Sequence, residues 1–435
     1  MLAGDIVALY AALFFTLLIR YGSADYYAEF RINHALPFSI IFFFWIVVFY
    51  ISGLYDLRHL RNNIDFLKTL ALAIIVNSGI AIVFFYLVPL FGIAPKTNLF
   101  IFIIVFTAIE AYWRRSYNRI LTSGEAPYRV LVMGNGQTTQ NVIDAIRHNP
   151  QLGYEIQHWI ESEPTGAALK SLRQLIGEQN VNLIIIPQHF KKDSELATAL
   201  YELLSMGIEI RDLPSFYELV FRKVPLSDLE ESWFLENLAE RRRFYDPLKR
   251  ASEFVFALVL GIVLLPIEIL IAILIKFTSP GPVIYRQLRT GENGKPFMLY
   301  KFRTMRSDAE KDGAKWADPN DIRATSLGKI LRYTHLDELP QLVNVIKNEL
   351  SFVGPRPERP EFIKVLAEKI PYYEIRHLVK PGVTGWAQIS YRYGASVEDS
   401  YEKLQYDIYY LKNRSLILDF AIVIRTLKSF FVNQK

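Results

Sequence analysis

The sequence predicts a membrane protein of mixed fold class, in which an apolar N-terminal region, an α/β module and a further apolar helix precede a polar C-terminal region. Hydrophobic residues make up 51% of the 435 residues and charged residues only 21%, below the ~25% typical of soluble domains. The apolar residues gather in long uncharged runs, and the middle of the chain alternates strand and helix patterns. At roughly 150 residues per domain, the length suggests about three units.

The composition excludes several kinds of site. The chain has no cysteine, which rules out disulfides, thiol nucleophiles and iron–sulfur clusters. Its seven histidines form no HExxH motif and no close cluster, so no zinc site is expected. The net charge of +5 is too small to indicate a nucleic-acid partner, and the basic residues lie beside apolar segments, which indicates a membrane surface.

Four uncharged runs, at 6–19, 36–55, 69–95 and 97–109, predict a four-helix transmembrane region over residues 1–115. A spanning helix needs ~20 apolar residues. The second and third runs meet this length, and the first and fourth meet it once their ends are counted. Four buried helices of a soluble core are the alternative, but such helices would carry a polar stripe, which the second run almost entirely lacks.

Basic residues predict the orientation of these helices. They follow the second run as Arg58, Arg61 and Lys68, and the fourth as Arg114, Arg115 and Arg119. The positive-inside rule then places both segments, the N-terminus and everything after about residue 115 in the cytoplasm. Arg20 and Arg31 in the first predicted loop oppose this orientation, and nearby acidic residues balance them only in part.

An α/β module is predicted over residues 125–225. Buried-strand patterns at 128–133 and 183–187 and a short strand at 207–210 alternate with helices at 137–147 and 196–206, which predicts a parallel sheet. The turn Gly134-Asn-Gly136 begins like the dinucleotide fingerprint G-x-G-x-x-G, but Thr139 replaces its third glycine. A nucleotide site and a structural or regulatory module both remain open, and the second is favoured.

A charged linker at 226–246 leads to an apolar run at 254–275. Pro266 lies near the middle of this run, where it removes a backbone hydrogen bond and bends a helix. Basic residues stand at both ends, including Arg241–Arg243 before the run and Lys276 after it. A helix that enters and leaves on one face fits this charge pattern, so a re-entrant helix is predicted over 250–278. A plain fifth span, which would place the rest of the chain outside, is the alternative.

The C-terminal region holds a carboxylate pair with basic residues around it. Asp337 and Glu338 precede Pro340, which belongs in the first turn of a helix. A helix N-terminus favours an anion by ~0.3–1 kcal/mol, so an ionised carboxylate here suits a nucleophile or a metal ligand. The alternative is an ordinary acidic N-cap and first turn, which would have the same sequence pattern. Asp407, further along, fits a role in the site or a surface position on a helix.

Cations surround the pair in sequence at Lys301, Arg303, Arg332, Arg356 and Arg392. Arg356 stands between two prolines, which leaves its backbone little freedom. Cations in several loops around an acidic pair suit a phosphate-rich substrate with a divalent metal such as Mg²⁺. The absence of a Walker loop argues against an ATPase.

Five motifs in this region are recognisable: SPGPVIYRQ at 279–287, KFRTM at 301–305, LDELPQLVNVIK at 336–347, SFVGPRP at 351–357 and KPGVTGWAQI at 380–389. The chain resembles the bacterial sugar transferase family, the monotopic polyprenyl-phosphate glycosyl-1-phosphate transferases, in its long form. The resemblance implies four spans, a Rossmann-like α/β module, and a mainly α catalytic domain over 247–435 with a re-entrant membrane helix. It also implies a multi-pass protein of the bacterial inner membrane with the catalytic domain on its cytoplasmic face.

The resemblance implies a reaction in which a sugar 1-phosphate passes from a UDP-sugar to undecaprenyl phosphate and UMP is released. This is the first membrane step of exopolysaccharide, capsule or O-antigen synthesis. By the family pattern Asp337 is the nucleophile that carries the phosphosugar and Glu338 helps to hold Mg²⁺. Lys301, Arg303, Arg332 and Arg356 then contact the phosphates or the nucleotide. A homodimer through the α/β module is a further expectation.

The chain departs from the family pattern at a few positions. Leu265 precedes Pro266 where a serine is usual, and His335 stands where a serine is common. Tyr391-Arg392-Tyr393 replaces the usual Gly-Arg-Asn, which puts the role of Arg392 in doubt.

Two other functions are weighed. An NAD-dependent nucleotide-sugar dehydratase or epimerase needs a Tyr-x-x-x-Lys pair, for which only Tyr245 and Lys249 qualify. An inactive assembly scaffold would not need the carboxylate pair.

Overall fold

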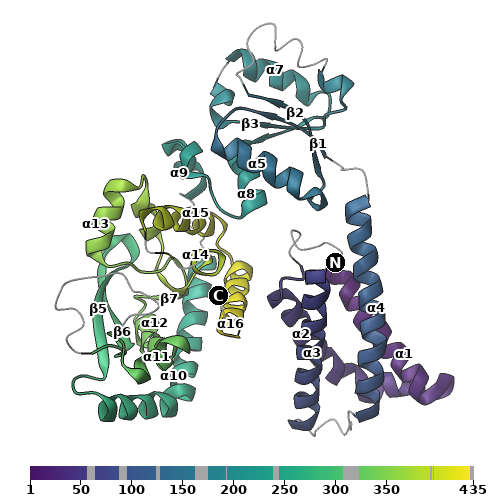
Figure 1. Cartoon of the computed structure of the whole chain (residues 1–435), viewed down its shortest axis with the longest axis vertical. Coiled ribbons are helices and arrows are strands. Elements are labelled where there is room, and N and C mark those ends of the chain that lie inside the picture. Colours follow the sequence, from purple (N-terminus) through teal and green to yellow (C-terminus); the bar gives the residue numbers. More distant parts are fainter. Residues whose placement is uncertain are drawn as a thin grey trace. The chain divides into compact units, whose positions relative to one another are not determined.

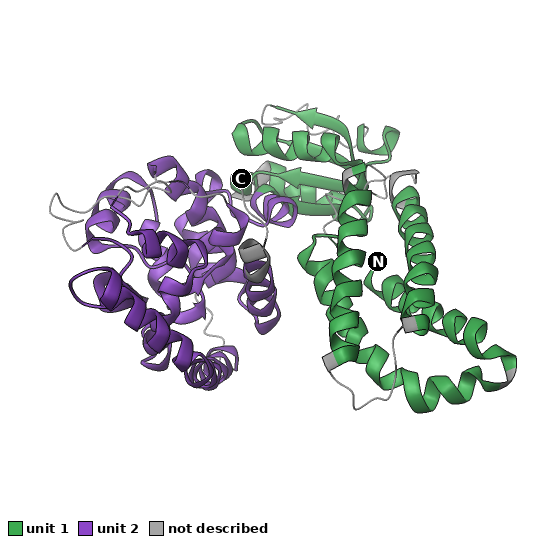
Figure 2. Cartoon of the chain, turned by 60° about the horizontal axis from the view of Figure 1, so that its bottom comes forward, with its two compact units in different colours: residues 1–213 green, residues 214–435 purple. Residues whose placement is uncertain are grey.

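The computed structural model describes residues 1–55, 64–87, 96–123, 128–161, 175–192, 194–238, 244–306, 323–391, 394 and 396–431. The chain divides into two compact units, Met1–Leu213 and Pro214–Lys435 (Figure 2). Five helices in the described part are long and apolar enough to cross a membrane: Leu2–Ser23, Asp25–Ile51, Phe66–Tyr86, Thr97–Ile120 and Tyr245–Thr278. The prediction of apolar helices near the N-terminus is therefore confirmed.

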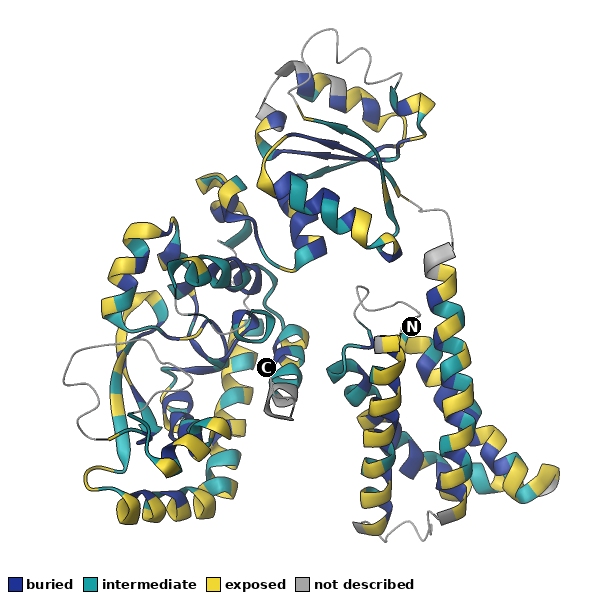
Figure 3. Cartoon of the chain, viewed as in Figure 1, coloured by how far each residue is buried: buried dark blue, intermediate teal, exposed yellow. Residues whose placement is uncertain are grey.

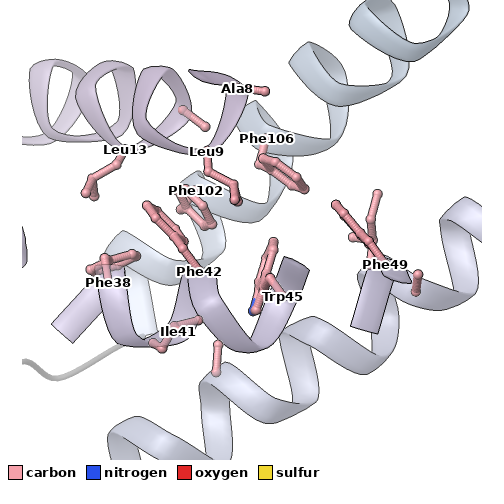
Figure 4. Packing of buried hydrophobic residues seen from close by; sticks show 14 of the residues in the cluster. Ala8, Leu9, Leu13, Phe38, Ile41, Phe42, Trp45, Phe49, Phe102 and Phe106 are labelled. Atoms are coloured by element: carbon pink, nitrogen blue, oxygen red, sulfur yellow. The ribbon is translucent and has the colours of Figure 1, made fainter. Parts of the chain in front are cut away.

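The first unit begins with a helical bundle of α1 (Leu2–Glu29), the π-helical turn η1 (Phe30–His34), α2 (Ala35–Ile51), α3 (Ile64–Leu87) and α4 (Lys96–Ser123). Aromatic rings of α2 and α4 interlock in its core, where Phe42 and Phe102 stack with ring centroids 5.6 Å apart and Trp45 meets Phe106 edge-on at 5.1 Å (Figure 4). The outer surface stays apolar, as Val7 and Ile75 are each about two-thirds exposed. An apolar core inside an apolar surface is what a bilayer requires.

Two features of the bundle differ from the sequence prediction. The first predicted loop is helical, because α1 continues through Arg20 and is interrupted only at Gly22, whose φ of +76° suits glycine. Arg114, counted above as a loop charge, is fully buried. Its guanidinium pairs with Asp5 and with Glu110 and donates to the carbonyl of Leu54 at 2.8 Å.

This buried ionic cluster fixes which helix ends lie together. Asp5 is in the first turn of α1, Leu54 follows the end of α2, and Arg114 is in the C-terminal half of α4. The start of α1, the end of α2 and the C-terminal half of α4 therefore meet at one end of the bundle. The sequence pattern did not reveal this contact, because Asp5 and Arg114 are more than 100 residues apart.

The α/β module follows in the first unit. Strands β1 (Tyr128–Met133), β2 (Tyr154–Ile160), β3 (Leu183–Ile186) and β4 (Glu209–Asp212) form a parallel sheet in the order β2-β1-β3-β4. Helices α5 (Gln137–His148) and α7 (Ser194–Leu204) lie on opposite sides of it (Figure 1). The predicted parallel sheet is confirmed, and its last strand begins two residues later than expected. Gly134 has a φ of +100°, and a Cβ there would lie 2.5 Å from Pro187, so the turn requires glycine.

The segment predicted as a linker is in part a helix packed into the second unit. Helix α8 (Leu213–Phe221), the 3-10 turn η6 (Leu226–Asp228) and α9 (Glu231–Leu238) precede the apolar helix. Trp233 and Phe234 of α9 are buried in the same core as Leu404 and Ile408. Residues 231–238 therefore belong to the core of that unit, which begins before the predicted boundary at 247.

Helix α10 (Tyr245–Thr278) contains Pro266 and forms two arms that meet at an angle (Figure 1). Ala257 of the first arm packs with Phe297, Leu299 and Leu342. Ile271 and Ile275 of the second arm pack with Phe302 and Leu331. Both arms thus contact the same unit, while most of their other apolar side chains are exposed (Figure 3).

The rest of the second unit is mainly helical, as predicted. Its short sheets are β5 (Ile284–Thr290) antiparallel to β6 (Pro296–Phe302), and β7 (Ser351–Val353) parallel to β8 (Gly382–Thr384). Its helical elements are α11 (Ser326–Tyr333), η8 (Leu336–Gln341), α12 (Leu342–Ile346), α13 (Pro360–Lys369), η9 (Tyr373–Leu378), α14 (Trp386–Ser390), α15 (Val397–Asn413) and α16 (Leu416–Phe431). The helix expected after Asp337 is a 3-10 turn followed by the five-residue α12.

Candidate active site

The carboxylate pair lies on η8, which is held against the second arm of α10. Leu336 and Leu339 flank the pair and pack against the cluster that contains Ile271 and Ile275. His335, just before η8, has a φ of +54° and ends the preceding helical turn. The site therefore lies beside the part of the second unit that carries the exposed apolar helix.

Glu338 is held by two of the predicted cations. The Nζ of Lys301, at the end of β6, donates to its Oε1 at 2.7 Å, and Nη2 of Arg356 lies 3.4 Å from the same oxygen. Burial would raise the pKa of Glu338, but attraction from Lys301 and Arg356 outweighs burial and lowers this pKa to about 2. Glu338 is therefore ionised at neutral pH and keeps Oε2 without a hydrogen-bond partner among the described residues.

Asp337 is 8% exposed and accepts no hydrogen bond from any described residue. Burial raises the pKa of this carboxyl above its usual value, and Lys301, His335 and Arg332 partly offset the rise. The sequence predicts a helix N-terminus here, whose dipole would favour the anion. The 3-10 turn and the short α12 supply little dipole, so burial has the larger effect. Asp337 is a carboxyl without a donor, in a site rich in cations.

Arg332 lies beside this carboxyl and is fixed by its neighbours. Its Nε donates to the hydroxyl of Thr304 at 3.0 Å. Gly328, one turn earlier on α11, permits the close approach, since a Cβ there would lie 2.0 Å from the carbonyl oxygen of Thr304. Thr304 was not among the predicted site residues, although it lies within the KFRTM motif.

Arg303 has a different position from the other predicted cations. It is 7% exposed and donates to the carbonyls of Pro280 and Ser279 at 2.9 and 2.8 Å. Gly281 is required at this turn, because a Cβ would lie 2.2 Å from the Arg303 guanidinium. Arg303 therefore ties the end of α10 to β6, and no described contact brings it to Glu338.

The loop that carries Arg356 is held along its backbone. Four successive carbonyl groups each accept a hydrogen bond of 2.9 to 3.0 Å: Pro355 from Gly382 N, Arg356 from Arg376 Nη2, Pro357 from Arg289 Nη1 and Glu358 from Thr290 N. Arg376 also pairs with Asp407 at 2.8 Å. Asp407 is 2% exposed, so the surface position considered for it is wrong. No sequence pattern pointed to Arg289 or Arg376.

The remaining predicted residues are placed as follows. Pro266 lies inside α10. Arg392 lies outside the described residues. Tyr245 and Lys249 lie in the second unit, where Lys249 donates to Tyr245 at 3.3 Å and to Tyr410 at 2.8 Å. The glycine turn belongs to the first unit.

The site's donor set fits Mg²⁺. Asp337 and Oε2 of Glu338 offer carboxylate oxygens that no described donor occupies. The described residues contain no group of three or more potential metal ligands. Mg²⁺ usually keeps several waters and binds through one or two carboxylates and substrate phosphates, so two adjacent carboxylates suffice for it.

These features define a membrane-associated enzyme of the phosphoryl-transfer class, with a carboxylate pair, fixed cations and an attached apolar helix. Residues 244–433 match the model of the bacterial sugar transferase family. The UDP-glucose:undecaprenyl-phosphate glucose-1-phosphate transferase of Escherichia coli is 31% identical over 343 residues, covering 75% of this chain and 71% of that protein. The chain therefore belongs to the bacterial sugar transferase family and is an enzyme.

Two further relatives show how far the similarity extends. A protein with the same name from Klebsiella pneumoniae is 28% identical over 99% of this chain and 94% of its own length. The UDP-N-acetylgalactosamine-undecaprenyl-phosphate N-acetylgalactosaminephosphotransferase of Aeromonas hydrophila is 41% identical, over 42% of this chain and 44% of that protein. The higher identity thus belongs to the shorter match, and the relatives differ in the sugar that their names give.

Proposed function

We propose that this enzyme transfers a sugar 1-phosphate from a UDP-sugar to undecaprenyl phosphate and releases UMP, as the first membrane step in the synthesis of an exopolysaccharide, capsule or O-antigen. The observation that carries the proposal is the position of Asp337, a carboxyl without a described donor beside Glu338, Lys301 and Arg332. The names of the relatives supply the donor and acceptor classes.

The proposed reaction has two displacements at one phosphorus atom. A carboxylate oxygen of Asp337 attacks the phosphorus that bears the sugar, and the bond to the bridging oxygen breaks, so that UMP leaves. A phosphate oxygen of the lipid then attacks the same phosphorus and releases the Asp337 carboxylate, which yields a lipid diphosphate sugar. Splitting the transfer in this way is the usual gain from a covalent intermediate.

Fixed positive charge makes an attack by an anion on a diphosphate feasible. Lys301 and Arg356 keep Glu338 ionised and in place. Arg332 is oriented by Thr304, and Arg356 by its clamped backbone. Mg²⁺, held by Glu338 and Asp337, would supply further screening of the phosphate charge.

The packing of α10 supports a re-entrant arrangement. A straight span about 30 Å long could not have both of its ends against one unit on one side of a bilayer. Both arms of α10 contact the second unit, through Ala257 and through Ile271 and Ile275. This supports a site at the membrane face, where the phosphate of an acceptor lipid would lie. The positive-inside rule and the family resemblance are the grounds for proposing the cytoplasmic side of the inner membrane.

An assay of UMP release tests the proposal. The full chain, with undecaprenyl phosphate and a panel of radiolabelled UDP-sugars, should release UMP and label the lipid with at least one donor. A dehydratase or epimerase would change the UDP-sugar without lipid and without UMP, and a scaffold would leave every donor intact. Either result would contradict the proposal.

Removal of divalent metal should stop the reaction. Chelation with EDTA should abolish UMP release, and added Mg²⁺ should restore it, because two carboxylates and a diphosphate would otherwise repel one another. The measurement is the initial rate at fixed ionic strength, with EDTA saturated by Mg²⁺ as the control. An unchanged rate in EDTA would show that the cations of the chain suffice.

The second unit should retain activity without the first. A fragment of residues 214–435 contains every described site residue and should release UMP. A fragment that begins at residue 240 lacks Trp233 and Phe234, which are buried, and burial of each such side chain contributes about 3–5 kcal/mol. It should therefore melt at a clearly lower temperature. If the longer fragment folds but is inactive, the first unit takes part in the reaction.

A further inference from the structure

A cavity of about 410 Å³ lies in the second unit, away from the carboxylate pair. It is lined by the first turns of α10, by η7 (Glu292–Gly294), by the loop before β8 and by the end of α15. None of the predicted site residues lines it. The residues that flank Asp337 pack instead on Ile271 and Ile275 of the second arm of α10. The cavity and the proposed active site are therefore associated with different arms of this helix.

Four cations line the cavity: Lys249, Arg250, Lys380 and Arg414. Two of them are paired, since Lys249 lies 2.9 Å from Asp419 and Arg414 lies 3.2 Å from Asp246.

The other two, Arg250 and Lys380, form no ion pair with a described residue. The described partner of the Lys380 ammonium is the neutral amide of Asn348. Two further carboxylates line the cavity: Glu253, which lies 3.8 Å from Lys249, and Glu292, which forms no ion pair with a described residue. Two unpaired cations therefore face one unpaired carboxylate.

The cavity is also lined by a hydrogen-bond donor that lacks an acceptor. Arg414 has a buried Nε without a hydrogen-bond partner, and a buried donor without an acceptor is destabilising. Burial lowers the pKa of the Lys380 ammonium. Arg250 and Lys249 lower this pKa further, while Glu292 and Glu253 raise it. Arg250 is thus close enough to interact with Lys380, and an anion between them would relieve their repulsion.

The position of the cavity along α10 identifies the anion. Tyr245, Lys249, Arg250 and Glu253 line it, and the apolar part of the helix begins at the next residue, Phe254. This is the level at which a membrane helix passes from headgroups to hydrocarbon. Leu378, which also lines the cavity, is 52% exposed.

We propose that this cavity binds the phosphate of an anionic phospholipid, with Arg250 and Lys380 as the recognising cations and the exposed face of α10 beside its acyl chains. The site is separate from the one that takes the acceptor lipid. It rests on the re-entrant placement of α10 but not on the transfer reaction.

The test uses the full chain, purified, delipidated and returned to phosphatidylcholine nanodiscs with a small fraction of phosphatidylglycerol. Retained phosphatidylglycerol is counted by native mass spectrometry. Wild type should retain it in preference to phosphatidylcholine. The variant R250Q/K380Q should bind it about thirtyfold less tightly, because each basic residue near anionic lipid contributes about fivefold.

Two further variants separate binding from folding. K347Q removes a lysine of the same unit that does not line the cavity and should bind as wild type does. R250K/K380R changes the same two side chains but keeps both charges, and it should bind phosphatidylglycerol as wild type does. This variant tests the role of charge even if R250Q/K380Q folds poorly. Equal retention by wild type and R250Q/K380Q, or no preference for phosphatidylglycerol, would overturn the proposal.

The remaining outcomes distinguish the source of the phosphate. Displacement of phosphatidylglycerol by millimolar inorganic phosphate would identify a site for free phosphate and overturn the proposal. Displacement by undecaprenyl phosphate, with loss of UMP release in R250Q/K380Q, would identify the acceptor site and overturn it as well. Failure of the transfer assay alone leaves the lipid measurement unaffected.

Discussion

Asp337→Asn should reduce UMP release by on the order of 10⁴-fold or more, the scale of loss when an enzyme nucleophile is removed. Asparagine has nearly the same shape but cannot form the acyl phosphate. Because Asp337 is buried without a described donor, its replacement by a neutral amide should leave the melting temperature unchanged or slightly raised.

A covalent adduct gives the decisive measurement. Wild-type protein incubated with radiolabelled UDP-sugar and Mg²⁺, without lipid acceptor, should acquire label and release a matching amount of UMP. Asp337→Asn should acquire none. Glu368→Gln, at an exposed position on α13, makes the same carboxylate-to-amide change away from the site and should label normally. Product formation without any labelled wild-type protein would mean that the lipid attacks directly and that Asp337 is not the nucleophile.

Arg376→Ala should cause the second large effect, on stability and on turnover together. Arg376 donates to Tyr373 and to the carbonyl of Arg356, and it pairs with Asp407. Removing one member of a buried ion pair costs about 3–5 kcal/mol, which corresponds to a fall of about 10 °C in the melting temperature. The loop that carries Arg356 also loses one of its four carbonyl contacts, so kcat should fall more than KM rises.

The stability loss should depend on pH. Burial raises the pKa of Asp407 to about 6, with Arg376 opposing the rise. A carboxyl whose pKa is higher in the folded state stabilises the fold at low pH, and this contribution is lost as the pH rises through the folded pKa. Without Arg376 the folded pKa rises further, so the loss continues above pH 6. The gap in stability between wild type and Arg376→Ala should therefore be larger at pH 8 than at pH 5.

Two controls separate positioning from general damage. Arg376→Lys keeps the charge but cannot make the same set of contacts, so it should restore most of the stability while kcat remains low. Arg147→Ala, at an exposed position on α5, should change neither quantity. If Arg376→Lys recovers both stability and kcat, the loop does not require the fork of the guanidinium.

The sequence predicted those parts of the molecule that depend on local pattern. The apolar runs, the strands at 128–133 and 183–187 and the adjacency of Asp337 and Glu338 are properties of neighbouring residues, and periodicity and composition reveal them. The motifs also predicted Lys301, Arg332 and Arg356 as site residues. In the structure, Lys301 and Arg356 contact the carboxylate of Glu338.

Features that depend on contacts between distant segments could not be predicted. Arg303 and Lys301 are two residues apart, yet one holds the turn at Ser279 and the other holds Glu338. Strand alternation would place two residues with this spacing on the same face, but β6 ends at Phe302 and Arg303 follows it. Arg376 and Arg289 donate to backbone carbonyls. Because every residue has a backbone carbonyl, the sequence does not show which carbonyl an arginine will contact. Arg114 looked like a loop charge because its partner Asp5 is at the other end of the bundle sequence.

The position of Asp5 has a consequence for the assembly of the bundle in the cell. During synthesis, the first helix leaves the ribosome long before the arginine that neutralises its acid exists. A lone acidic side chain is unfavourable in hydrocarbon, so the first helix should remain near the lipid headgroups or the insertion machinery until the fourth helix arrives. The bundle would then pack only after the fourth helix is complete. A ribosome stalled before residue 114 should leave the N-terminus accessible to protease.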